Sequence, residues 1–332
     1  MAIILVTGAS GFIASHVIRA FLQKGYNVRG TVRSEKSAAG VRKTHSQYAE
    51  KLSLVVVPDM TVLTAFDEAV QGVDGVVHLA SPFIMNATDF ENELFVPAIQ
   101  GTNAILTSIQ KHSPNVTRVV ITSSFGAVVD PTKGDRPGYT YTEADWNPIT
   151  TTSTFPHNAV TAYLASKTCA EQAAWDFVES QKPSFSITTL CPPLVYGPVI
   201  HAVETPAGLN TSSADIYRLI NGSEKTVPPM AFWAFVDVRD AAHAHLRAFE
   251  TPEAAGQRYL VSGSSYTYQQ ICDIIRAKFP ALRDSTPEGA PGEPIPSAYK
   301  LDTRKVVNEL GMKFRPLEET VTDTVMSLLT LK

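Results

Sequence analysis

The sequence predicts an α/β protein built on a doubly wound parallel sheet, and three observations carry that prediction. Short, almost entirely apolar β-type runs alternate with helix-length amphipathic segments over residues 1–130. Strands of this kind are buried on both faces, which is typical of a parallel sheet covered by helices on each side. A length of 332 residues and a hydrophobic share of 44% provide enough apolar material for the core of such a sheet.

The elements are expected in a regular order along the chain. Strands are expected at 3–6, 27–32, 53–57, 75–79, 118–122 and 186–190, and helices at 14–24, 62–71, 90–111 and 159–181. Beyond these the alternation loosens, with further helices at 214–221, 238–250, 268–279 and 317–329. We therefore expect one domain over 1–190, with segments returning from the C-terminal half, and a smaller lobe formed mainly by 191–332.

Charge and composition exclude several classes of function. The chain has 28 Lys and Arg against 32 Asp and Glu, so its net charge of −4 offers no basic field for nucleic acid or an anionic membrane. Cys169, Cys191 and Cys272 suit neither a disulfide framework nor a cysteine zinc site. His243 and His245 fall on different sides of a helix, so no metal site is expected. The apolar N-terminal run is too short for a signal peptide or a membrane span, and we expect a cytoplasmic protein.

A glycine-rich turn follows the first strand, in the stretch Thr7-Gly8-Ala-Ser-Gly11-Phe-Ile-Ala14. Gly8 permits a tight turn, Gly11 lets the backbone approach a pyrophosphate, and Ala14 allows a helix to pack closely on the strand. The same residues would serve a strand–turn–helix that binds nothing. Their position after the first strand favours a dinucleotide site.

The end of the second strand indicates which dinucleotide is bound. An NAD site places a carboxylate there, whereas Gly30-Thr-Val-Arg33-Ser contains none before Glu35. The Arg33 guanidinium could pair with a 2′-phosphate, assisted by Lys36, although it could also be a solvated cation. The sequence therefore favours NADP over NAD. After the third strand, Asp59 could accept a hydrogen bond from adenine or simply cap the turn before Met60.

Candidate chemical groups follow the fifth strand. Tyr163 and Lys167 stand four residues apart in an expected helix, so they share one face, and we expect Lys167 to lower the pKa of Tyr163. Ser124 lies at the end of the strand in Thr-Ser-Ser124 and could donate a hydrogen bond to a carbonyl oxygen. Either serine could equally be a simple strand terminator. A phenol, an ammonium and a hydroxyl in this order suit proton transfer to a carbonyl.

Taken together, these motifs resemble the extended short-chain dehydrogenase/reductase superfamily over nearly the whole chain. Further similar stretches are His78-Leu-Ala-Ser-Pro-Phe83, Cys191-Pro-Pro-Leu-Val-Tyr-Gly-Pro198 and Phe235-Val-Asp-Val-Arg-Asp-Ala-Ala-His-Ala-His245. Within the superfamily, the chain is most similar to yeast and fungal NADPH-dependent carbonyl reductases that act on methylglyoxal and isovaleraldehyde, which are relatives of plant dihydroflavonol reductases. The stretches at 57–59, 143–148, 173–175 and 313–317 carry this closer similarity.

The resemblance implies a Rossmann-type sheet, a smaller C-terminal substrate lobe, and NADPH or NADP+ as the cofactor. It makes Tyr163 the general acid, Ser124 the group that polarises the carbonyl, and Lys167 the partner of the nicotinamide ribose. The residues expected to contact the cofactor are Gly8, Gly11, Phe12, Ile13, Arg33, Lys36, Asp59, Met60, Ala80, Ser81, Tyr163, Lys167, Pro192 and Val195. The expected substrate pocket consists of Phe83, Phe125, Val129, Val160 and Leu194, which suits a small hydrophobic aldehyde or ketone.

Two other functions and one departure from the family remain open at this point. A sugar-nucleotide epimerase or dehydratase would use the same tyrosine and lysine, but with a tightly bound NAD. A catalytically silent NADP-binding sensor would keep the nucleotide site alone. Many members of the superfamily also place an asparagine before the fifth strand as part of a proton relay, where this chain offers Gln100 or water. We expect a monomer or a homodimer.

Overall fold

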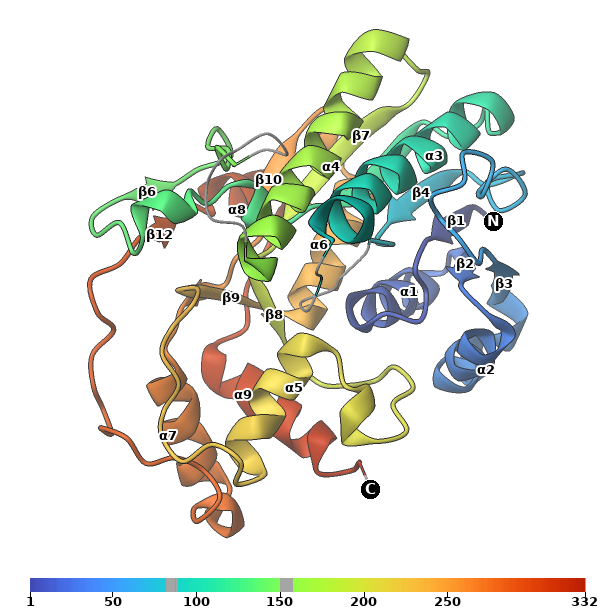
Figure 1. Cartoon of the computed structure of the whole chain (residues 1–332). Coiled ribbons are helices and arrows are strands. Elements are labelled where there is room, and N and C mark those ends of the chain that lie inside the picture. Colours follow the sequence, from blue (N-terminus) through green and yellow to red (C-terminus); the bar gives the residue numbers. More distant parts are fainter. Residues whose placement is uncertain (82–86, 88, 150–157, 332) are drawn as a thin grey trace.

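A seven-stranded sheet forms the centre of the protein (Figure 1). The computed structural model describes residues 1–81, 87, 89–149 and 158–331. The strand order is β10-β7-β5-β4-β1-β2-β3, and every neighbouring pair in this sheet is parallel. The strands are β1 (Ile3–Val6), β2 (Asn27–Val32), β3 (Leu52–Val56), β4 (Gly75–His78), β5 (Arg118–Thr122), β7 (Ser186–Cys191) and β10 (Arg258–Leu260). The parallel sheet expected from the sequence is thereby confirmed.

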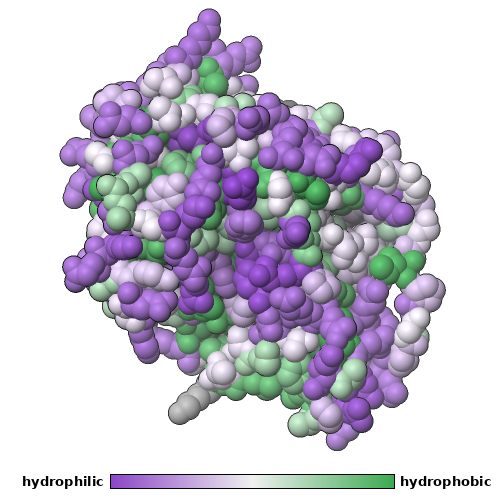
Figure 2. All heavy atoms as spheres, turned by 180° about the vertical axis from the view of Figure 1, so that it is seen from behind, coloured by the Kyte–Doolittle hydropathy of each residue, from purple (hydrophilic) through white to green (hydrophobic). Residues whose placement is uncertain are grey.

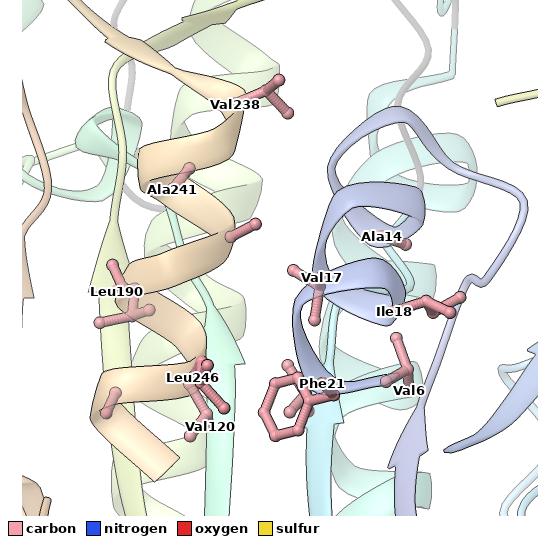
Figure 3. Packing of buried hydrophobic residues seen from close by; sticks show 14 of the residues in the cluster. Val6, Ala14, Val17, Ile18, Phe21, Val120, Leu190, Val238, Ala241 and Leu246 are labelled. Carbon is pink, nitrogen blue, oxygen red and sulfur yellow. The ribbon is translucent and has the colours of Figure 1, made fainter. Parts of the chain in front are cut away.

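Helices cover both faces of this sheet, as its apolar strands require. On one face α1 (Phe12–Lys24) packs against α6 (Val238–Glu250), and on the other α3 (Val96–His112) packs against α4 (Ala159–Gln181). Figure 3 shows Phe21 of α1 and Leu246 of α6 among the buried side chains above the strands. Each face therefore has its own apolar core, and the fold class is doubly wound.

A second group of elements surrounds a separate apolar cluster. A three-stranded sheet combines β8 (Leu194–Tyr196), β9 (Ala234–Asp237) and β11 (Ser264–Ser265). The helices α5 (Thr211–Ile220), α7 (Tyr268–Lys278) and α9 (Leu317–Leu328) contribute to this cluster. Between these segments, α6 and β10 return to the large sheet, and α8 (Arg304–Leu310) packs beside them. The division of the chain at residue 190 stays a prediction.

Two short strands form a separate two-stranded sheet. β6 (Thr140–Tyr141) pairs in parallel with β12 (Lys300–Leu301). Figure 2 shows one face of the molecule, on which hydrophilic residues predominate and hydrophobic ones are interspersed. None of the helices that the structure describes combines the length and the apolar character needed to cross a membrane.

Two expectations about helices need correction, and one further helix was not expected. The segment 62–71 forms successive turns rather than a helix, because most of its backbone bonds span three residues, as from Ala65 to Val62. Its apolar side chains Phe66 and Val70 are buried all the same, which explains the helix-like pattern. The sequence did not indicate α2 (Glu35–Thr44), which buries little more than Ala38 and Val41. The helix expected from residue 90 begins as a π-helical turn, η2 (Glu91–Phe95), before α3.

The contact between α1 and the sheet yields a prediction about stability. Phe21 is fully buried and packs edge-on against the ring of Phe249, next to the end of α6. Phe21→Ala should lower the free energy of unfolding by about 3–5 kcal/mol, because it removes buried apolar surface and leaves a cavity. Equilibrium urea unfolding measures this change. Met326→Ala, at a half-exposed side chain, is the control and should cost about 0.5 kcal/mol or less. Equal losses in the two variants would contradict the packing of Phe21 against Phe249.

Candidate active site

The glycine turn between β1 and α1 is held against the end of β4. The Thr7 hydroxyl accepts hydrogen bonds from the Leu79 and Ala80 amides, both at 3.0 Å. Gly8 has φ +67°, and a Cβ there would lie 3.1 Å from the Ala80 Cα, so only glycine fits this approach. Gly11 is the N-cap of α1 and supplies no capping side chain. This leaves the first amides of α1 available to an anion, so the chain fits the phosphates of a dinucleotide.

A cavity of about 380 Å³ opens beside this turn, at the carboxyl edge of the sheet. Its lining is mainly apolar and combines the turn, the ends of several strands and α4. Thirteen of the residues expected from the sequence line it: Gly8, Gly11, Phe12, Ile13, Ser81, Ser124, Phe125, Val160, Tyr163, Lys167, Pro192, Leu194 and Val195. Residues from both halves of the chain therefore meet in one space.

The two serines after β5 have different partners. The Ser123 side chain is buried, and its hydroxyl donates to Glu171 Oε2 at 2.5 Å. Ser124 is the N-cap of the short 3₁₀ helix η3 (Phe125–Ala127), and its hydroxyl oxygen accepts from the Gly126 amide at 2.9 Å. Because Ser124 lines the cavity and its hydroxyl proton is not used in that bond, it can donate to a bound oxygen.

Tyr163 and Lys167 stand one turn apart on α4, which begins with a capping box between Asn158 and Thr161. The Lys167 ammonium is buried and donates to the Ser81 hydroxyl at 3.2 Å. Burial lowers the pKa of Lys167 to about 8, although the carboxylate of Glu171 acts in the opposite direction. The cavity thus contains a cation whose pKa lies only slightly above neutral pH.

The expectation that Lys167 lowers the pKa of Tyr163 is wrong for this structure. Burial raises the pKa of the Tyr163 phenol well above its usual value. The physical reason is that the apolar surroundings disfavour the phenolate, and a lysine that is itself destabilised as a cation does little to offset this. The phenol therefore keeps its proton, as a general acid requires.

The residues expected at the adenosine end lie outside the cavity lining. Arg33 directly follows β2 and its side chain is exposed. Lys36 is also exposed, with its Nζ 3.8 Å from a carboxylate oxygen of Glu204. Asp59 accepts bonds from the amide and the hydroxyl of Thr61, at 2.8 and 2.7 Å, which lowers its pKa. The role of a turn cap for Asp59 is thus realised, and its other oxygen stays available.

Four further expected residues do not line the cavity: Met60, Ala80, Val129 and Gln100. Met60 packs against α3, where a Cβ on Gly101 would lie 2.2 Å from its Cε. Ala80 packs against the glycine turn, where its backbone lies next to Gly8. Val129 is buried in an apolar cluster with Phe125 and does not line the cavity. Phe83 falls outside the described residues. Gln100, the candidate for a proton relay, has an exposed side chain on α3 and does not line the cavity.

The polar part of the wall was not expected from the sequence. Asn210, Thr211 and Ser212 line the cavity at the start of α5, which begins three residues earlier than the apolar pattern indicates. The run of Asn, Thr and Ser is typical of a helix N-cap and could have located this start. Phe232, before β9, also faces the cavity. Within the described ranges, no three His, Cys, Asp or Glu side chains gather in a way that could hold a metal ion.

Comparison with known proteins places the chain in a family. Residues 4–262 match the model of the NAD dependent epimerase/dehydratase family. The chain is 39% identical to the NADPH-dependent methylglyoxal reductase of Saccharomyces cerevisiae, over 98% of each chain, and 38% identical to a ketoreductase of Aspergillus niger, over 98% of this chain and 97% of that one. It also resembles the solved structure of yeast methylglyoxal/isovaleraldehyde reductase complexed with NADPH, with a TM-score of 0.90, 37% identity and 98% of each chain covered. The chain therefore belongs to the NAD dependent epimerase/dehydratase family, the extended short-chain dehydrogenases/reductases.

Proposed function

We propose that this protein is an NADPH-dependent carbonyl reductase, which converts small hydrophobic aldehydes and ketones to alcohols. One observation carries the proposal: a dinucleotide turn opens into the same apolar cavity as Ser124, Tyr163 and Lys167. The relatives that are similar over nearly the whole chain include proteins named as NADPH-dependent methylglyoxal reductases from two yeasts. A silent sensor would have no need of these three groups in that cavity.

Each of the three polar groups has a distinct role in this proposal. Tyr163 is the general acid, because its buried phenol remains protonated and can give its proton to the carbonyl oxygen. Ser124 stabilises the charge that develops on that oxygen by donating a hydrogen bond from its hydroxyl group. Lys167 binds the nicotinamide ribose with its ammonium, at the position where it now contacts Ser81.

The remaining cofactor contacts follow from the shape of the site. NADPH, when bound, supplies the hydride. The glycine turn and the first amides of α1 hold the pyrophosphate, together with Phe12 and Ile13. Arg33, Lys36, Asp59 and Met60 take the adenosine end, with Arg33 as the partner of the 2′-phosphate. The other expected contacts are Ala80, Ser81, Pro192 and Val195.

The substrate pocket is proposed to be apolar. Phe125, Val160 and Leu194 line the cavity, joined by Phe232, and the proposed pocket also includes Phe83 and Val129. Such a lining favours hydrophobic carbonyl compounds, and Lys167, which is assigned to the cofactor, is the one cation among its described residues. The end of β2 likewise lacks the carboxylate typical of the NAD-dependent epimerases. A cytoplasmic location and a monomeric or homodimeric state remain predictions.

The proposal is tested by measuring NADPH oxidation with methylglyoxal, isovaleraldehyde and an aryl ketone. Tyr163→Phe should lower kcat about 10²- to 10⁴-fold, because the ring stays in place without its proton. Fluorescence titration should show that NADPH binding by this variant stays within about twofold of the original, because the ring still packs in place. Tyr217→Phe, on α5 and outside the cavity lining, is the control. Full activity in Tyr163→Phe would exclude this residue as the acid, and NADPH binding without any turnover would favour a sensor.

The choice of cofactor should depend on Arg33. We expect a strong preference for NADPH over NADH, and Arg33→Ala should raise the KM for NADPH about 10- to 100-fold, since a charge-assisted bond to phosphate is lost. The KM for NADH should change little. Arg42→Ala removes the same charge from the exposed face of α2 and should leave both values unchanged. Equal use of NADH and NADPH by the unmodified protein would overturn the inference about Arg33.

The pH dependence of reduction should follow Lys167. Both the ammonium and the phenol act in their protonated forms, and burial lowers the pKa of Lys167 to about 8 while it raises that of Tyr163. Lys167 therefore loses its proton first as the pH rises. We expect kcat/KM to be constant below about pH 8 and to fall roughly tenfold per pH unit above it. Initial rates over a pH series test this, and a profile that stays flat well past that value would contradict it.

A further inference from the structure

A buried carboxylate lies behind the candidate active site, on the helix that carries Tyr163 and Lys167. Glu171 is 1% exposed and follows Lys167 by one further turn of α4. Its oxygens accept bonds from the hydroxyl of Ser123 at 2.5 Å, after β5, and from that of Thr189 at 2.7 Å, on β7. A carboxylate this deeply buried is costly unless it is paired and fully hydrogen-bonded, so the arrangement is a strong constraint on the helix.

The partner of this carboxylate is Arg258 on β10. The Arg258 Nε lies 2.7 Å from Glu171 Oε1, and its Nη2 lies 3.1 Å from Oε2. The guanidinium also donates to backbone carbonyls, through Nη2 to Ala127 at 3.2 Å and through Nη1 to Asp145 at 2.6 Å. Ala127 belongs to η3, which begins directly after Ser124. The ion pair thus connects α4 to the segment that presents Ser124 to the cavity.

We propose that Glu171 is a positioning residue of the reductase site, where its carboxylate, held by Arg258, fixes the helix of Tyr163 and Lys167 against the segment that carries Ser124. This inference rests on the proposed function. It assigns no contact with substrate or cofactor to Glu171. Instead, the carboxylate acts through the groups beside it, because it contacts Ser123 directly and lies one turn from Lys167.

The charge of Glu171 has a second consequence, for the protonation of Lys167. Among the residues that the structure describes, the titratable groups near Lys167 are Tyr163 and Glu171 on α4, Cys191 on β7 and His78 on β4. Burial keeps the phenol and the thiol protonated, and it lowers the pKa of His78 to about 3, so the imidazole is neutral. Glu171, paired with Arg258, makes the largest electrostatic contribution of this set, and it favours the ammonium form of Lys167.

Glu171→Gln tests the inference by a readout that does not depend on turnover. The amide has nearly the same shape but no charge, so Lys167 should lose its proton at lower pH. NADPH binding, followed by the cofactor's fluorescence over a pH series, should weaken from a midpoint roughly one pH unit below that of the unmodified protein. At a pH below both midpoints, kcat should still fall about 10- to 100-fold, because the Ser124 segment and α4 are no longer held together.

Three other variants separate positioning from a loss of folding. Glu179→Gln removes the same charge from an exposed position on α4 and should leave midpoint, kcat and thermal unfolding unchanged. Glu171→Asp keeps the charge but shortens the side chain, so it should restore the midpoint while kcat stays low. If Glu171→Gln does not fold, Glu171→Met combined with Arg258→Met removes both charges and should fold, because no unpaired charge is left. That double variant should show the lowered midpoint.

The outcomes distinguish this inference from the proposed function. An unchanged midpoint in Glu171→Gln, with only a lower unfolding temperature, would overturn the inference and leave the reductase proposal intact. An equally lowered midpoint in Glu179→Gln would also overturn it. If none of the carbonyl compounds makes the unmodified protein oxidise NADPH, the proposed function fails. The binding midpoints would then still report whether Glu171 controls Lys167.

Discussion

The carboxyl edge of one parallel sheet is the constraint on which the rest of this protein depends. Parallel strands all end at the same edge, so segments more than a hundred residues apart in sequence are brought to one place. Gly8 follows β1, Ser124 follows β5 and Pro192 follows β7, and all three line the same cavity. The helices on both faces keep the strands in register by burying their apolar side chains. The chemistry of the site is thus a consequence of the topology of the sheet.

Within that frame, α4 links the cavity to the interior. Tyr163, Lys167 and Glu171 succeed one another at intervals of one turn, and their surroundings change from an apolar cavity to a buried ion pair. Burial acts on the first two groups in opposite directions on the pKa scale, because it favours the neutral form of each. The phenol is thereby kept as an acid. The carboxylate of Glu171, which is paired with Arg258, favours the ammonium form of Lys167.

Much of the fold and of the site followed from local patterns. The strands β1, β2 and β5 and the helices α4 and α6 have the bounds that the sequence predicts, because each combines a clear period with a clear end signal. The segment 62–71 was wrongly expected to be a helix, because successive turns bury Phe66 and Val70 at the same spacing as a helix. In α2 the reverse holds, since a helix at the edge of the sheet buries too few apolar residues to produce a pattern. The start of α5 after Asn210 was missed because its first residues, Thr211 and Ser212, are polar and add nothing to an apolar pattern.

The sequence by itself determined most of the strands and helices, the glycine turn and the identity of the polar groups, because these depend on side-chain type and on spacing along the chain. Only the tertiary structure decided which of the two serines after β5 is available, since Ser123 is engaged by Glu171 and Ser124 is not. It also decided the direction of the pKa shift of Tyr163, which depends on how far the phenol is removed from water. The pairing of Glu171 with Arg258 joins positions 87 residues apart, and no local pattern carries information over such a distance.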